Sequence, residues 1–152
     1  MSEQRDSGHR QALTPYLIVK GASRAIEFYR QAFGAEEILR LDGPDGRVGH
    51  AEIRLGDSHL MLADEHPDFG ALSPISVGGS PVNLHLYVDD VDRVVERAAS
   101  AGAVILRPVK NEFYGDRTGM IVDPFGHRWQ LATAVEAVSA EEVKARYEAA
   151  TR

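Results

Sequence analysis

Residues 14–37 read TPYLIVKGASRAIEFYRQAFGAEE, and residues 83–103 read NLHLYVDDVDRVVERAASAGA. Each stretch begins with a short apolar run, continues with apolar residues at helical spacing, and reaches a glycine where a helix would end. A shift of 69 residues superposes the first half of the chain on the second, so that Leu17 falls on Leu86, Val19 on Val88 and Leu62 on Leu131. The chain therefore contains an internal duplication.

Each half is expected to fold as one strand, one helix and three further strands. The strands of the first half are predicted at about 14–20, 36–42, 48–55 and 59–64, and those of the second at 82–88, 103–108, 118–122 and 127–133. Gly34 and Gly102 are expected to end the two helices. One face of each helix is apolar, formed by Ala25, Ile26, Tyr29, Ala32 and Phe33 in the first and by Val91, Val94, Val95 and Ala98 in the second.

This pattern predicts an α+β fold in which two tandem βαβββ modules form an eight-strand curved, partly open, barrel-like sheet with helices on the outside. We expect a flexible tail over residues 1–12 and a single domain over 13–135. The domain consists of a first module at 13–66, a linker at 67–81 and a second module at 82–135. Residues 136–152 are predicted to hold a C-terminal helix, because Ser139 and Glu142 form a capping box.

The composition narrows the class of protein. The 152 residues, 43% hydrophobic, suffice for one domain with a core, and the net charge of -6 disfavours a nucleic-acid partner. No apolar run is long enough to span a membrane, and the first residues lack the apolar stretch of a signal peptide. The chain has no cysteine, which excludes disulfides and thiolate metal sites and fits a cytoplasmic location.

Alternation along the strands predicts two different sheet faces, because successive side chains of a strand point to opposite sides. The face expected to pack under the helices is formed by Leu17, Val19, Ala51, Ile53, Leu55, Leu60, Leu62, Leu84, Leu86, Val88, Trp129 and Leu131. The opposite face is polar and aromatic, formed by Thr14, Tyr16, Ile18, His50, Glu52, Arg54, His59, Met61, Asn83, His85, Tyr87, Arg128 and Gln130. This second face is either exposed to solvent or forms the wall of a pocket. The pocket is favoured because both halves carry polar and aromatic residues on it.

The chain resembles the vicinal oxygen chelate superfamily of glyoxalases, bleomycin-resistance proteins and extradiol dioxygenases. The resemblance covers residues 14 to 135 and rests on the two opening stretches together with YGDRTGMIVDPFGHRWQLAT at 114–133. It is closest to the PhnB-like branch, in which Tyr-Gly-Asp-Arg and Asp-Pro-Phe-Gly-His are typical. The resemblance implies a concave sheet that encloses a small molecule.

In metal-dependent members of that superfamily, His, Gln or Glu side chains of the first and last strand of each module hold a divalent cation. The corresponding positions here are Thr14, Met61, Asn83 and Gln130. Only Gln130 is a plausible ligand for a hard or borderline cation. The resemblance thus implies that the metal centre has been lost, and it disfavours glyoxalase I and extradiol dioxygenase chemistry.

Several other residues, most of them on the inward face, carry side chains that suit more than one role. His50, Glu52 and His85 could rebuild a metal site or supply an acid/base pair, or they could be hydrogen-bonding wall residues. His127 is expected to brace the Asp-Pro-Phe-Gly-His turn, and Trp129 is expected in the core. Asp116 and Arg117 are expected to form an ion pair that orders their loop, with an anion-contacting arginine as the alternative.

We therefore expect a metal-independent small-molecule binding protein, with drug sequestration as the role implied by the resemblance and with no cofactor. The residues expected to line its pocket are Thr14, Tyr16, His50, Glu52, Met61, Asn83, His85, Tyr87 and Gln130. The alternative is a lyase or isomerase that acts on a small oxygenated substrate with His85 or Glu52 as base, with or without a divalent metal. A third is an assembly module whose sheet face is covered by another subunit. A homodimer is expected in each case.

Overall fold

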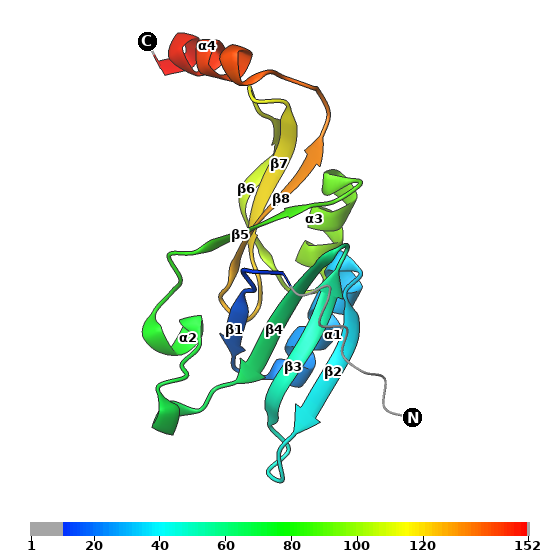
Figure 1. Ribbon diagram of the computed structural model, residues 1–152, viewed down its shortest axis with the longest axis vertical. Helices are drawn as coiled ribbons and strands as arrows, with labels where there is room; N and C mark the ends of the chain where they lie inside the picture. The colour runs from blue at the N-terminus through cyan, green and yellow to red at the C-terminus, as the bar shows by residue number, and fades with distance from the viewer. Residues whose placement is uncertain (1–10, 152) are drawn as a thin grey trace.

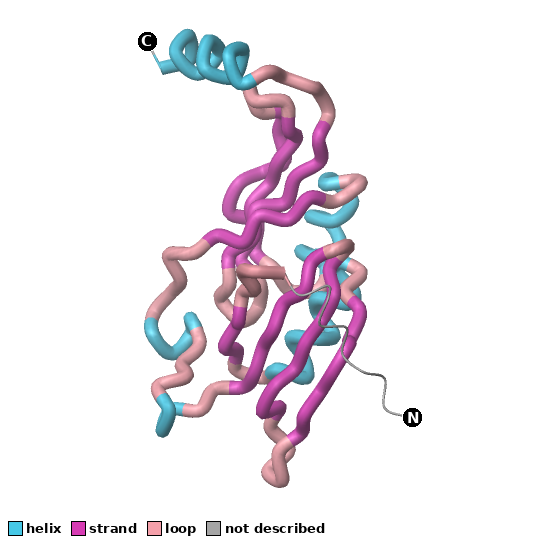
Figure 2. Tube along the Cα trace, in the orientation of Figure 1, coloured by secondary structure: helices cyan, strands magenta, loops and turns pink. Residues whose placement is uncertain are grey.

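The computed structural model describes residues 11–151 and confirms the α+β class (Figures 1 and 2). The first module consists of β1 (Tyr16–Val19), α1 (Ala22–Phe33), β2 (Glu36–Asp42), β3 (Val48–Leu55) and β4 (Ser58–Asp64). The second consists of β5 (Asn83–Tyr87), α3 (Val91–Ser100), β6 (Val104–Asn111), β7 (Asp116–Val122) and β8 (Arg128–Ala134). The short helices η2 (Pro67–Phe69) and α2 (Pro74–Val77) lie between the modules, and α4 (Ala140–Thr151) follows them. None of the helices in the described residues is long and apolar enough to cross a membrane.

Both modules have the same strand order, which confirms the duplication. The first sheet runs β1-β4-β3-β2 and the second β5-β8-β7-β6, with the opening strand of each module parallel to the closing strand. The parallel pair follows from the helix, which crosses over between the opening strand and the rest of its sheet. The eight strands are divided between two four-stranded sheets that do not hydrogen-bond to each other, so the barrel is open.

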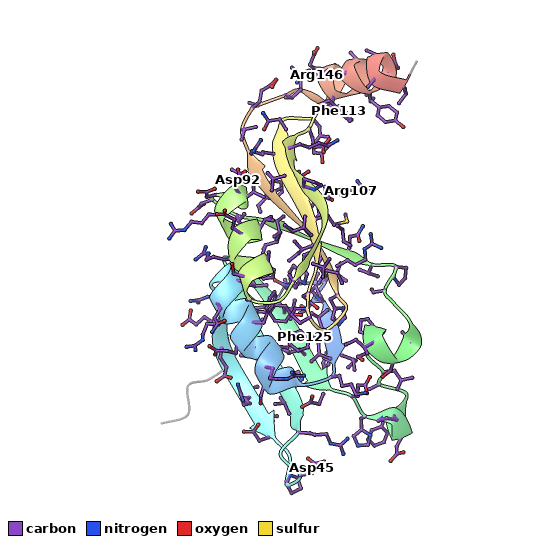
Figure 3. The ribbon with its side chains drawn as sticks, turned by 180° about the vertical axis from the view of Figure 1, so that it is seen from behind. Asp45, Asp92, Arg107, Phe113, Phe125 and Arg146 are labelled. Carbon is purple, nitrogen blue, oxygen red and sulfur yellow. The ribbon has the colours of Figure 1, made fainter. Side chains whose placement is uncertain are left out.

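The helices cover one face of the sheets, as the alternation predicts. α1 and α3 pack against each other, and both lie on the same side of the molecule (Figure 3). The side chains predicted to face the helices are buried or packed against the buried cluster, and Trp129 is 2% exposed. Burial of this apolar surface is the main favourable contribution to folding.

A buried carboxylate joins the modules within this core. The Oδ2 atom of Asp123 accepts hydrogen bonds from the Tyr29 hydroxyl at 2.6 Å and from Trp129 Nε1 at 2.9 Å, while Oδ1 accepts from the backbone N–H groups of Phe125 and His127. The ring of His127 also contacts the backbone oxygen of Ile18 at 2.9 Å. The predicted bracing role of His127 is confirmed, and the turn is tied to the first module.

The boundaries differ from expectation in a few places. Thr14 precedes β1, and α3 ends at Ser100, two residues before Gly102, which has φ 115°. The predicted tail lies outside the described residues except for Gln11 and Ala12; the side chain of Gln11 hydrogen-bonds to both backbone groups of His59. The N–H groups of Ala101 and Gly102 still bond to carbonyls of the last turn of α3, so the helix end and the glycine that follows it differ by the one or two residues usual at helix termini.

Candidate functional site

The inner face of the first sheet, the face away from the helices, brings together residues from three strands. In the strand register Tyr16 lies beside Met61, and Met61 lies beside Glu52. Leu39 of β2 completes this row on the far side of Glu52. Of the nine residues predicted to line a pocket, Tyr16, His50, Glu52 and Met61 therefore gather on this one sheet.

Three of these side chains form a hydrogen-bonded chain. The Tyr16 hydroxyl lies 2.8 Å from Nδ1 of His50, and Nε2 of His50 lies 2.8 Å from Oε2 of Glu52. The side chain of Glu52 is 7% exposed and that of His50 is 24% exposed. The chain thus runs from a buried carboxylate to a phenol at the surface of the inner face.

The direction of these hydrogen bonds follows from the charge of the carboxylate. With Glu52 ionised, the carboxylate only accepts; His50 Nε2 then donates to Glu52, and Nδ1 accepts from the Tyr16 hydroxyl. Burial, and after it the Glu52 carboxylate, raises the pKa of the Tyr16 hydroxyl. Tyr16 therefore stays protonated at neutral pH, and its hydroxyl is the hydrogen-bond donor to Nδ1 in this arrangement.

A cavity of about 520 Å³ opens beside this chain. Its walls are Tyr16 and Ile18 of β1, the β2–β3 turn, the end of β4, and the segment from Glu65 to Ala71. A volume of this size accommodates a small organic molecule. Tyr16 is the residue shared by the cavity and the hydrogen-bonded chain.

The segment that closes the cavity was missed in the sequence, where residues 67–81 were expected only to link the modules. His66 and Phe69 both line the cavity, and their rings stack with centroids 4.3 Å apart. Pro67 at the start of η2 and Pro74 at the start of α2 are the local signals for these short helices. Proline and glycine are equally typical of an open linker, so the signal does not discriminate between the two.

Of the other five predicted pocket residues, Thr14 lies just before β1 and four lie on the second sheet. Asn83, His85 and Tyr87 alternate along β5, and His85 is adjacent to Gln130 in the register. Gln130 Nε2 donates to the Tyr114 hydroxyl at 3.4 Å. The imidazole that hydrogen-bonds to Glu52 is therefore that of His50, whereas His85 lies on the other sheet.

The predicted ion pair between Asp116 and Arg117 is wrong. Asp116 accepts a hydrogen bond from the Tyr87 hydroxyl at 2.7 Å, while Arg117 pairs with Asp92 of α3 at 2.8 Å. The two residues are consecutive in β7, so their side chains point to opposite faces of the sheet. The hydrogen bond to Asp116 raises the pKa of Tyr87.

The residues at the family's metal positions do not fit a divalent cation. Met61 lies on the first sheet and Thr14 just before it, whereas Asn83 and Gln130 lie on the second sheet, and none of the four supplies a carboxylate or imidazole. Within residues 11–151 no group of three His, Asp or Glu side chains is close enough to hold a metal ion. The alternative set of His50, Glu52 and His85 is therefore not assembled within one chain.

The fold and this inner face place the chain in a known family. Residues 10–131 match the Glyoxalase/Bleomycin resistance protein/Dioxygenase superfamily, and the chain belongs to that superfamily. It is 42% identical over 137 residues to Rv0887c, an uncharacterised protein of Mycobacterium tuberculosis strain H37Rv. The matched region covers 88% of this chain and 81% of that protein.

Solved structures share the fold. The product of Arabidopsis thaliana At5g48480 has a TM-score of 0.65 at 28% identity, and the match covers 81% of this chain and 98% of that one. The fosfomycin resistance protein FosX of Mesorhizobium loti has a TM-score of 0.60 at 17% identity, over 88% of this chain and 96% of that one. At that identity the likeness to FosX concerns the fold alone.

Proposed function

We propose that the chain is a metal-independent small-molecule binding protein that sequesters its ligand at the inner faces of its sheets. The observation that carries the proposal is the cavity of about 520 Å³ beside Tyr16. Sequestration needs shape, aromatic contact and a few placed hydrogen bonds, and the first sheet supplies all three. The superfamily name includes bleomycin resistance, which supports a drug as the sequestered ligand.

Of the nine predicted pocket residues, Tyr16 alone lines the cavity, and the proposal extends the ligand site from there over the inner faces of both sheets. Thr14, Tyr16, His50, Glu52 and Met61 would contact the ligand from the first module. Asn83, His85, Tyr87 and Gln130 would contact it from the second. Because the two sheets do not hydrogen-bond to each other, we also propose that a second copy of the chain completes the enclosure as a homodimer. A cytoplasmic location fits the absence of cysteine.

Thermal unfolding in the presence of a panel of planar antibiotics, with and without chelator, tests the binding function. A ligand at about 100 times its Kd stabilises a folded protein by about 2.7 kcal/mol, which raises Tm measurably. We expect at least one compound to raise Tm equally with and without EDTA. Elemental analysis of protein purified without chelator is expected to show no stoichiometric transition metal.

Variants at the cavity sharpen this test. Tyr16→Ala removes the phenol that the cavity shares with His50 and is expected to abolish the rise in Tm. Tyr147→Ala on α4 is the matched control, because Tyr147 is similarly exposed but lies outside the cavity lining. A panel in which no compound stabilises the protein, or in which stabilisation needs a metal, would overturn the proposal.

The hydrogen-bonded chain of Tyr16, His50 and Glu52 favours one second candidate, a lyase or isomerase. A carboxylate that orients an imidazole raises its basicity, so His50 could take a proton from a carbon beside a carbonyl and return it to a neighbouring atom. His50→Gln separates the two functions. An enzyme would lose turnover by about 100-fold or more while it still binds substrate, whereas a sequestering protein has no turnover to lose.

A further inference from the structure

Arg128 carries a guanidinium edge that no carboxylate of residues 11–151 occupies. Its neighbour Trp129 is in the core, so by alternation Arg128 points to the inner face of the second sheet. Among residues 11–151, Nη2 donates to the sulfur of Met120 at 3.6 Å, and Nε is buried without a hydrogen-bond acceptor. A thioether is a weak acceptor, so this edge of the guanidinium is left almost unsatisfied.

Buried donors without acceptors are rare in folded proteins, because each costs about 1–3 kcal/mol of desolvation. Nε and Nη2 lie on the same edge of the guanidinium, which is the edge that donates two parallel hydrogen bonds to one carboxylate or phosphate group. Met120 lies across this edge. Its unbranched side chain can adopt other rotamers at low cost and so expose the edge to a ligand.

A second arginine lies on the same face. Arg107 of β6 is adjacent to Met120 in the register, and Met120 is adjacent to Gln130. Figure 3 shows Arg107 on the side of the sheet away from α3. Arg128 lies one row further along β8, beside Val122 in the register, and reaches Met120 diagonally through Nη2. The two arginines therefore approach Met120 from the two neighbouring strands, with Gln130 in the same row as Met120 and Arg107.

The carboxylates in and next to this sheet have other partners than the two arginines. Asp116 accepts from Tyr87, Glu112 lies near Lys110 and Thr118, and Asp123 is in the core. The corresponding row of the first sheet carries the opposite charge, since Glu52 stands where Met120 does and Leu39 where Arg107 does. This row has therefore diverged between the two modules, with a carboxylate at its centre in the first and an arginine beside a methionine in the second.

We propose that Arg128 and Arg107 form an oxyanion subsite of the ligand site, so that the ligand carries a carboxylate, phosphonate or sulfonate on an apolar body. The subsite rests on the proposed small-molecule function and specifies its ligand class. Arg128 donates in bidentate fashion from Nε and Nη2, and Arg107 adds charge. The tilted rings of His85 and Tyr87, with centroids 4.9 Å apart, lie on the same face and contact the apolar body.

Calorimetric titration with phenylphosphonate, benzoate and the neutral isostere benzamide tests the subsite. We expect both anions to bind at least about tenfold more tightly than benzamide, because a hydrogen bond to a charged group contributes about 1.5–3 kcal/mol. Arg128→Gln should weaken the anions by about tenfold or more and leave benzamide unchanged. Arg128→Lys keeps the charge but loses the paired donors, so its affinity for the anions should lie between that of the unmodified protein and that of Arg128→Gln.

The N–H resonance of Arg128 Nε reports occupancy directly in the intact protein. It should shift saturably with phenylphosphonate and yield the calorimetric Kd. Arg117→Gln is the matched control, since Arg117 lies on the opposite face of the same sheet and pairs with Asp92. The melting temperature of each free variant shows whether it is folded.

Each failure has its own signature. Equal binding of benzoate and benzamide, or unchanged anion affinity in a folded Arg128→Gln or Arg128→Lys variant, overturns the oxyanion subsite but leaves the proposed function standing. Unsaturable shifts spread over many arginines mean an adventitious ion only and also overturn it. Absence of binding by these probes and by the wider antibiotic panel overturns the proposed function and the subsite together.

Discussion

At the scale of single residues, Asp123 joins the two modules. Its carboxylate accepts from Tyr29 of the first helix and from Trp129 of the last strand, both of them buried. Burial, and after it the Asp123 carboxylate, raises the pKa of Tyr29 well above its usual value, so the phenol remains a donor. The Asp-Pro-Phe-Gly turn was visible in the sequence, but the partners of its aspartate were not.

Asp123→Ala is expected to lower the free energy of unfolding by about 3–5 kcal/mol, because it leaves the Tyr29 hydroxyl and the Trp129 N–H buried without an acceptor. Urea denaturation followed by tryptophan fluorescence measures the change. Tyr29→Phe, which removes one donor and keeps the ring, should cost only about 1 kcal/mol. Equal effects of the two substitutions would contradict this role of Asp123.

At the scale of elements, the segment that bounds the cavity is held by one carboxylate. Glu65 accepts hydrogen bonds from the hydroxyls of Ser73 and Ser76 and from the backbone N–H of Ser73. Ser73 is the N-cap of α2, so Glu65 joins the end of β4 to this helix. These hydrogen bonds favour the ionised carboxylate and lower the pKa of Glu65 from 4.5 to about 2.

This lowered pKa makes the segment sensitive to acid. The folded carboxyl releases its proton more readily than the unfolded one, so its contribution to stability is present above pH 4.5 and is lost as the pH falls towards about 2. Carbon-13 NMR titration should give a midpoint near 2 for Glu65. Ser73→Ala should move the midpoint towards 4.5, whereas Ser80→Ala, in the same linker, should leave it in place. A midpoint near 4.5 in the unmodified protein would show that Ser73 and Ser76 do not stabilise the ionised Glu65 carboxylate.

At the scale of the whole molecule, the two inner faces are open and carry large exposed side chains. Tyr16 is 47% exposed, and Tyr87 and Val104 are each 60% exposed. α4 extends from one end of the molecule with no buried residue, although its Arg146 pairs with Glu136 at 2.6 Å (Figure 1). Exposed apolar surface of this kind is typical of a face that another subunit covers.

We expect light scattering after gel filtration to give twice the 16.7 kDa mass of the chain. Val104→Asp, on the inner face of the second sheet, should shift the protein towards monomer, because a buried unpaired charge in an interface is costly. Val77→Asp changes an equally exposed valine outside the sheets and should leave the mass unchanged. A monomeric mass at all concentrations would refute the homodimer.

The sequence by itself determined the duplication, the order of elements and the division of each strand between a helix-facing side and an inner side. Those features depend on the spacing of apolar residues along one segment, which is a local property. It therefore identified Trp129 as core and His127 as a brace, and it located Tyr16, His50 and Glu52 on a common face.

Only the tertiary structure decided which of those inward residues meet. Strand pairing across a sheet sets the neighbours of a side chain, and spacing along the chain does not encode it. For this reason Tyr16 of β1 contacts His50 of β3, Asp116 contacts Tyr87 rather than Arg117, and the guanidinium edge of Arg128 has no carboxylate partner within residues 11–151. The contact between His50 and Glu52 is the exception, because the two residues lie two positions apart on one strand. The segment after β4 became a cavity wall through contacts between elements, which no local pattern contains.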